Sequence, residues 1–360
     1  MAMNINELLK LMVKAGISDI HFKADAPPLI RIYGKLMSSD FENFTSKQIE
    51  ELADTMLTKE QKEKFNMENE LDVSYAVENV SRFRINIYRQ RNTMALTLRV
   101  VPVKIKTFDE LNLPGETLKK LAAQPRGLIL VTGVTGAGKT TTMNSILDHI
   151  NANFSYNIIT VEDPIEFYHK DKKSSISQRE IGIDTKSFKN ALKYVLRQDP
   201  DIVVMGEMRE YEAISAGITA AETGHLVLST IHTIDAVQTI DRILDTYPEH
   251  QQRQARIQLS NVLRGVVAQR LCTTIDGKGR IPATEVLVGT SLVRKLILEN
   301  KTQELYKAME QGEYYGMHTF DQYLNKLYTE KKIRLEEALD KATNPEDLQL
   351  KLKGMFQEMM

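Results

Sequence analysis

The chain has little cysteine and no long hydrophobic run. Cys272 is the single cysteine in 360 residues, which excludes an internal disulfide framework and a multi-cysteine zinc site and fits a reducing cytosol. No apolar stretch approaches the roughly 18 residues that a membrane-spanning helix needs. The opening MAMNINELLK carries acid and amide groups and has no long apolar core, so we expect no signal peptide.

The chain also lacks a charge excess, a low-complexity tract and an obvious internal repeat. Its formal net charge is -1 and it has no basic tract, so composition disfavours a nucleic-acid partner such as that of a translocase. A hydrophobic share of 42% and a charged share of 26% are ordinary for a globular protein. The length predicts about two domains.

The first hundred residues predict a small α+β domain. An amphipathic helix pattern covers residues 6–15, and residues 46–68 are also typical of helices. Alternating strand patterns lie around the Pro27-Pro28 turn and, further on, in residues 71–77, 81–90 and 94–101. We therefore assign residues 1–101 to an N-terminal domain and residues 102–115, with Pro102 and Pro114, to a linker.

The middle of the chain predicts a different class of domain. Continuous apolar strands, in residues 127–133, 157–163, 202–207 and 225–232, alternate with segments of helical length. Such a pattern indicates a mostly parallel sheet in an α/β domain. We assign residues 116–289 to this core and residues 290–360 to a helical C-terminal region.

A phosphate-binding loop follows the first of these strands. Residues 133–140 match G-x-x-x-x-G-K-[ST] at every fixed position. The alternative, a glycine-rich turn with a chance lysine, is disfavoured by the buried strand before the loop and the helix after it. Lys139 is expected to reach the β- and γ-phosphates, and the Thr140 hydroxyl to be a magnesium ligand. The nucleotide-binding candidates here are Gly133, Thr135, Gly136, Ala137, Gly138, Lys139, Thr140 and Thr141.

Polar side chains gather at the ends of the other core strands. Groups just past the carboxyl ends of the strands of an open α/β sheet face the ligand crevice. Each of these strand-end side chains also has a simpler explanation. Carboxylates there are often only solvated, His225 could satisfy helix-end carbonyls, and His232 could be a core histidine. The residues in question are Glu162, Asp163, Glu166, Glu207, Arg209, His225 and His232.

One strand end looks incomplete. In DIVVMGEMRE, Gly206 follows the apolar residues 202–205 at the place where many nucleotide-binding chains carry a magnesium-binding aspartate. Taken alone, this position indicates a missing metal ligand.

Four segments together resemble a known family. They are GVTGAGKTTT, ITVEDPIEF, VVMGEMRE and GHLVLSTIHT, in this order. The set is similar to the secretion ATPases of type II secretion and type IV pilus systems, and most resembles the pilus retraction ATPases of the PilT/PilU family. Residues 18–36, 81–91, 318–333 and 342–354 extend the resemblance over nearly the whole chain. It implies an α/β fold with a RecA-like P-loop ATPase core, a smaller PAS-like N-terminal domain and a helical C-terminal region.

The resemblance also assigns roles to the strand-end residues. This family typically has glycine at the position of Gly206, followed by a glutamate regarded as the catalytic base, here Glu207. It implies that Glu162 supports catalysis by helping to coordinate magnesium through water, with Asp163 and Glu166 nearby. It also implies that His225 and His232 couple the site to domain movement and sense the γ-phosphate. The implied metal ligands are Thr140, Glu162 and Glu207.

Arginines of the N-terminal domain are the remaining site candidates. The resemblance implies that Arg82, Arg84 and Arg99 approach the phosphates. Arg82 and Arg84 lie two positions apart and share one strand face, which excludes Phe83 and suits an anion. The alternative is a solvated strand face.

The family further implies a homohexameric ATPase that uses ATP and Mg²⁺ to power pilus retraction and twitching motility. Its expected partners are an inner-membrane pilus platform protein and a sister retraction ATPase, and its expected place is the cytoplasm, at the inner-membrane pilus base.

Two alternatives stay open. A pilus assembly or type II secretion ATPase usually has an extra N-terminal domain and a four-cysteine motif, which this chain does not match. A nucleotide-binding accessory subunit of a sister motor is disfavoured because every catalytic position is filled. The chain also departs from the retraction ATPases in residues 291–300, SLVRKLILEN, where Leu298 replaces the second arginine of the usual AIRNLIRE.

Overall fold

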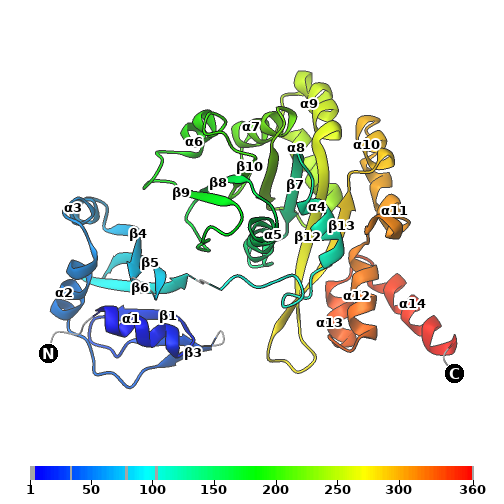
Figure 1. Ribbon diagram of the computed structural model, residues 1–360. Helices are drawn as coiled ribbons and strands as arrows, with labels where there is room; N and C mark the ends of the chain where they lie inside the picture. Colours follow the sequence, from blue (N-terminus) through cyan, green and yellow to red (C-terminus); the bar gives the residue numbers. More distant parts are fainter. Residues whose placement is uncertain (1–4, 33–34, 78–79, 102–103, 359–360) are drawn as a thin grey trace. The chain divides into compact units, whose positions relative to one another are not determined.

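The computed structural model describes residues 5–32, 35–77, 80–101 and 104–358 (Figure 1). These residues divide into two units. The first contains the chain up to residue 104 together with residues 166–168, and the second contains residues 105–165 and 169–360. The linker predicted for residues 102–115 stays a prediction, since residues 105–115 belong to the second unit and residues 102–103 fall outside the described ranges.

The first unit is an antiparallel sheet with helices, in agreement with the predicted α+β domain. The sheet has the order β3-β2-β1-β6-β5-β4. Its strands are β1 (Ile17–Lys23), β2 (Leu29–Ile32), β3 (Lys35–Ser38), β4 (Glu70–Val77), β5 (Ser81–Gln90) and β6 (Thr93–Val101). The helices are α1 (Ile5–Lys14), α2 (Ser46–Met56) and α3 (Lys59–Glu68).

This sheet has one apolar face and one polar face. Along β5, buried and half-buried residues alternate, as the two-residue repeat of a strand requires. Phe83 and Ile85 are fully buried in a core that includes Leu9 of α1 and Ile49 of α2. The prediction that Phe83 points into the core is therefore confirmed.

The second unit is built on a seven-stranded sheet of order β13-β12-β7-β11-β10-β8-β9. The strands from β12 to β9 are parallel, and β13 pairs with β12 in the antiparallel sense. Their bounds are β7 (Gly127–Thr132), β8 (Asn157–Glu162), β9 (Ser175–Glu180), β10 (Ile202–Met205), β11 (Leu226–Ile231), β12 (Leu263–Thr273) and β13 (Arg280–Val288). The predicted mostly parallel α/β sheet is confirmed; β9, β12 and β13 are strands that the sequence analysis did not predict.

Helices cover both faces of this sheet, which explains the continuous apolar runs of its central strands. Leu128 and Leu130 of β7 pack in one core cluster with α7, α8 and α9, whereas Ile129 and Val131 pack in another with α4 and α5. Helices α5 and α7 thus pack against opposite faces of the sheet. The helices are α4 (Gly115–Ala122), α5 (Lys139–Asn153), α6 (Phe188–Val195), α7 (Tyr211–Glu222), α8 (Ala236–Asp245) and α9 (Glu249–Val262).

The chain after β13 is helical, as predicted. It forms α10 (Ser291–Leu298), α11 (Leu305–Glu310), α12 (Phe320–Thr329), α13 (Leu335–Lys341) and α14 (Pro345–Glu358), with short 3₁₀ turns at Thr302–Glu304 and Glu313–Tyr315. Phe320 and Leu324 of α12 pack on Cys272 of β12 and Ile281 of β13. In the described parts of the chain, every helix is too short or too polar to span a bilayer.

A buried carboxylate joins two helices of the second unit. Glu285 of β13 is 1% exposed, and its Oε1 accepts a hydrogen bond of 2.9 Å from the N–H of Ala236, the first residue of α8. It also accepts from the N–H of Phe320, the first residue of α12, and burial raises the pKa of Glu285 to about 7. Glu285 therefore ties the start of α8, just past His232, to the C-terminal helices.

Candidate functional site

The carboxyl ends of four neighbouring parallel strands place polar groups at one edge of the sheet. Strands β7, β11, β10 and β8 are adjacent, and their last residues are close to register, with Thr132 opposite Ile231 and Met205 opposite Val161. The next residues along each strand are the phosphate loop after β7, His232 after β11 and Glu207 after β10, while Glu162 ends β8. The structure thus brings together four of the predicted site elements.

The loop between β7 and α5 depends on glycine. Gly133, Gly136 and Gly138 have φ of 150°, 80° and 89°, a region that favours glycine. At Gly133 a Cβ atom would lie 2.7 Å from the carbonyl oxygen of Gln269 and 2.8 Å from the Cβ of Ala137, so no side chain fits there. Thr135 and Gly136 are exposed at the tip of the loop.

The start of α5 is arranged to receive an anion. Gly138 is its N-cap and supplies no side-chain acceptor, so the first N–H groups of the helix are not capped by a side chain. Lys139 is buried, and its Nζ donates to the carbonyl oxygens of Gly133 at 2.9 Å and Val134 at 3.2 Å. A helix start with a buried lysine and glycine-curled backbone is a phosphate-binding arrangement. Thr140 and Thr141 follow, both half-buried.

Glu162 is buried and held in one orientation. Its Oε1 accepts hydrogen bonds from Thr160 Oγ1 at 2.6 Å and Gln178 Nε2 at 3.0 Å. Charge-assisted bonds of this kind fix a carboxylate more firmly than bonds between neutral groups. Asp163 and Glu166 are exposed, and Glu166 belongs to the first unit.

Glu207 forms a charged cluster with its neighbours. Its Oε1 lies 2.7 Å from Arg209 Nε and 3.4 Å from His232 Nε2. Burial lowers the pKa of His232 below its ordinary value, and the positive charge of Lys139 lowers it further, while Glu207 acts in the opposite direction. His232 is therefore neutral at neutral pH, and its imidazole lies within electrostatic reach of the phosphate-loop lysine.

His225 does not belong to this cluster. It precedes β11, and its carbonyl oxygen accepts from the N–H of Gly127 at the start of β7. It is thus at the amino ends of the strands, separated from His232 by the six residues of β11, about 20 Å of strand. Contact of His225 with nucleotide stays a prediction, and this place at the amino ends of the strands does not favour contact within its own chain. Its Nδ1 lies 3.0 Å from the Ala220 carbonyl oxygen in the last turn of α7, which fits the alternative of a helix-end residue.

The three arginine candidates lie on the polar face of the sheet in the first unit. Arg84 is directly opposite Arg99 in the pairing of β5 with β6, and Arg82 lies on the same face of β5. Arg99 Nε donates to Asp19 at 2.6 Å, and Arg84 makes an ion pair of 3.3 Å with a carboxylate of β4. Their approach to phosphate stays a prediction.

The sequence analysis missed several residues around Glu162. Thr160 and Gln178 hold its carboxylate, and Glu180 is its register partner on β9. The strand-end rule applied to β9 would have found Glu180, but the polar sequence SISQRE has no apolar run by which to recognise a buried strand.

The site residues could supply only some of the ligands of a hard divalent cation. The Thr140 hydroxyl and the Glu162 carboxylate offer oxygen atoms, the donors that Mg²⁺ takes. In the part of the chain that the structure describes, no group of three His, Cys, Asp or Glu side chains could hold a metal ion. Mg²⁺ usually keeps several waters and takes further ligands from substrate phosphates.

Comparison with known proteins shows the family of the chain. Residues 3–294 match the family model described as type II/IV secretion system protein. The chain is 41% identical to the type IV pilus retraction ATPase PilT of Pseudomonas aeruginosa, over 96% of this chain and 100% of that protein. It is 38% identical to the type IV pilus ATPase PilU of the same organism, over 98% and 92%. A crystal structure of the pilus retraction motor PilT with bound ADP superposes with a TM-score of 0.90 at 44% identity, covering 96% of this chain and 99% of the other.

Proposed function

The chain belongs to the type II/IV secretion system protein family and, within it, to the PilT-type retraction ATPases, and we propose on this premise that it hydrolyses ATP to power type IV pilus retraction. The observation that carries the proposal is the edge of the sheet where the phosphate loop, Glu162, Glu207 and His232 meet. A solved relative of this fold is described with bound ADP, and that relative covers nearly the whole chain.

Nucleotide binding is proposed for the loop and the start of α5. The uncapped N–H groups and Lys139 neutralise phosphate charge, and the nucleotide would replace the loop carbonyls as partners of the lysine. Thr140 and Glu162 would hold Mg²⁺, which when bound neutralises charge on the β- and γ-phosphate oxygens. Gly206 is then no missing ligand, because Glu162 on the neighbouring strand supplies the carboxylate.

The chemical step is proposed for Glu207. Hydrolysis forms a bond from a water oxygen to the γ-phosphorus and breaks the bond from that phosphorus to the leaving oxygen of ADP. A carboxylate oxygen of Glu207 takes the proton of the water as general base. Arg209, at 2.7 Å, orients the carboxylate, and this ion pair leaves Glu207 less suited to the metal role than Glu162. For neutral His232, which lies 3.4 Å from Glu207 and within electrostatic reach of Lys139, we propose contact with the γ-phosphate.

The assembly around this site is proposed from the family. We infer a homohexamer that acts on an inner-membrane pilus platform protein, with a sister retraction ATPase as a further partner, at the cytoplasmic base of the pilus. The paired Arg84 and Arg99 on the sheet of the first unit, with Arg82 beside them, are the proposed arginines that approach the phosphates.

A deletion strain tests the cellular role. Loss of twitching motility with excess surface pili, restored by the wild-type chain but not by Glu207→Gln, is the expected result. Loss of pili would instead assign the chain to pilus assembly. Restoration by Glu207→Gln would show that the chain acts without hydrolysis, as an accessory subunit.

A further inference from the structure

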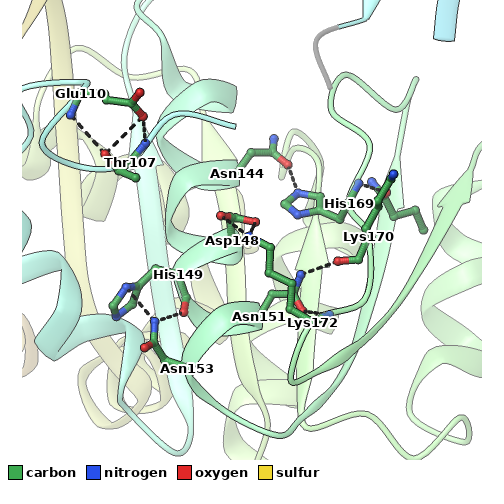
Figure 2. Close-up of polar contacts among 11 residues, drawn as sticks. Thr107, Glu110, Asn144, Asp148, His149, Asn151, Asn153, His169, Lys170 and Lys172 are labelled. Atoms are coloured by element: carbon green, nitrogen blue, oxygen red, sulfur yellow. Dashed lines mark hydrogen bonds and ion pairs between the residues drawn. The ribbon is translucent and has the colours of Figure 1, made fainter. Parts of the chain in front are cut away.

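A segment between β8 and β9 is fastened along α5. We call residues 169–174 the strap. Asn151 of α5 donates through Nδ2 to the Lys170 carbonyl oxygen at 2.8 Å and accepts at Oδ1 from the Lys172 N–H at 3.0 Å. Lys172 Nζ also lies 2.6 Å from a carboxylate oxygen of Asp148 on the same face of α5 (Figure 2). These contacts fix the far end of the strap to the helix.

The near end of the strap is buried and reaches toward the phosphate loop. His169 is 5% exposed, and its Nε2 lies 2.6 Å from Asn144 Oδ1, as Figure 2 shows. Asn144 Nδ2 donates to the carbonyl oxygen of Thr140 at 2.9 Å, which leaves Oδ1 as the acceptor for His169. His169 therefore carries its proton on Nε2. Its Nδ1 is buried with no partner among the described residues, and burial lowers the pKa of His169 to about 4, so the ring is neutral at neutral pH.

The backbone of the same histidine leads to the other side of the site. The N–H of His169 donates to Gln178 Oε1 at 2.8 Å. Gln178 Nε2 donates in turn to Glu162 Oε1 at 3.0 Å. His169 thus lies in the middle of a continuous path of hydrogen bonds. This path runs from the main chain of Thr140 on α5 to the carboxylate of Glu162 on β8.

We propose that His169, acting through Asn144 and Gln178, is a positioning residue that sets the spacing of Thr140 and Glu162 for a divalent cation. The inference rests on the proposed function, in which those two residues hold Mg²⁺. Mg²⁺ demands near-ideal octahedral geometry, so a small change in this spacing weakens its binding. Loss of such outer partners costs about 10- to 100-fold in metal affinity in other proteins.

The competing explanation is that His169 only anchors the strap. The two explanations differ in what a second anchor would do. Lys172 fastens the same strap to the same helix through Asp148, but its contacts do not lead to Thr140 or Glu162. Lys172→Ala is therefore a matched control that loosens the strap and leaves the path intact.

The experiment measures the affinity of the purified full chain for ADP with saturating Mg²⁺ and with a chelator. We expect His169→Leu, which removes the Nε2 donor, to leave affinity in the chelator within about twofold. We expect it to weaken affinity with Mg²⁺ by about 10- to 100-fold. His169→Gln keeps an amide donor near Nε2 and should recover most of that loss. Lys172→Ala should match the wild type in both conditions.

The inference is overturned if His169→Leu changes the two affinities equally or not at all, or if Lys172→Ala reproduces its effect. Should His169→Leu fail to fold, Gln178→Leu cuts the path on the Glu162 side and must show the same selective loss with Mg²⁺. A wild-type chain that binds ADP equally with Mg²⁺ and with chelator would contradict the part of the proposed function in which Thr140 and Glu162 hold Mg²⁺. If the wild-type chain binds ADP more tightly with Mg²⁺ than with chelator, and His169→Leu and Gln178→Leu both keep this difference, only the inference is contradicted.

Discussion

Glu285 makes the stability of the second unit depend on pH, and Glu285→Gln removes that dependence. Burial raises the pKa of this carboxyl from 4.5 to about 7 in the folded chain. Between these values the folded chain keeps a proton that the unfolded chain releases, so the free energy of unfolding falls as pH rises. The whole gap corresponds to about 3 kcal/mol at about 1.4 kcal/mol for each pH unit. Part of this fall takes place below pH 5. We therefore expect the free energy of unfolding to fall by about 2.5 kcal/mol between pH 5 and pH 8.

The assay is urea unfolding of wild type and Glu285→Gln at both pH values, followed by circular dichroism because the chain has no tryptophan. Glutamine keeps one acceptor oxygen for the N–H of Ala236 and cannot ionise. The free energy of unfolding of the variant, taken relative to that of wild type, should therefore rise by about 2.5 kcal/mol from pH 5 to pH 8. The exposed Glu336→Gln is the control and should follow the wild type at both pH values. A difference between wild type and Glu285→Gln that is the same at pH 5 and pH 8 would refute the reasoning.

Three further changes test the site. Gly133→Ala should weaken nucleotide binding by at least about tenfold, or about 1.4 kcal/mol, because its Cβ would lie 2.7 Å from the Gln269 carbonyl oxygen; calorimetric titration with ADP measures this, and unchanged affinity would contradict it. Gly206→Ala should fold with a stability within about 1 kcal/mol of wild type, because its Cβ would meet the Glu162 backbone at an ordinary 3.4 Å; a larger loss in urea unfolding would show that the glycine is required sterically. Arg84→Ala should lower ATP turnover without lowering ATP affinity. Normal turnover would contradict the proposed approach of Arg84 to the phosphates and would indicate a solvated surface residue.

The fold was predictable where one local pattern determines the structure. Alternation gives the two-sided strand β5, and the continuous apolar runs of β7 and β11 indicate a sheet covered on both faces. The polar β9 carries no such pattern, because its place at the sheet edge comes from pairing with β8. Strand β12 likewise takes its place in the sheet from pairing with the distant β7, although its hairpin with β13 is local.

The site was predictable to the same extent. The spacing of the phosphate loop is local, and the strand-end rule gathers Glu162, Glu207 and His232. It does not apply to His225, which precedes its strand and lies at the opposite end of the sheet. The contacts of His169 with Asn144 and Gln178 depend on how a loop folds back on α5, and no spacing in the sequence encodes that.

The central claim is that Glu207 is the base of an ATP-hydrolysing site, and turnover of Glu207→Gln tests it most directly. We predict that this variant binds ATP with Mg²⁺ as tightly as wild type within a few-fold, while kcat falls by about 10²- to 10⁴-fold. Glu210→Gln, an exposed change three positions further along the chain, should keep the wild-type kcat. An unchanged kcat in Glu207→Gln, measured by phosphate release at saturating ATP, would contradict the account.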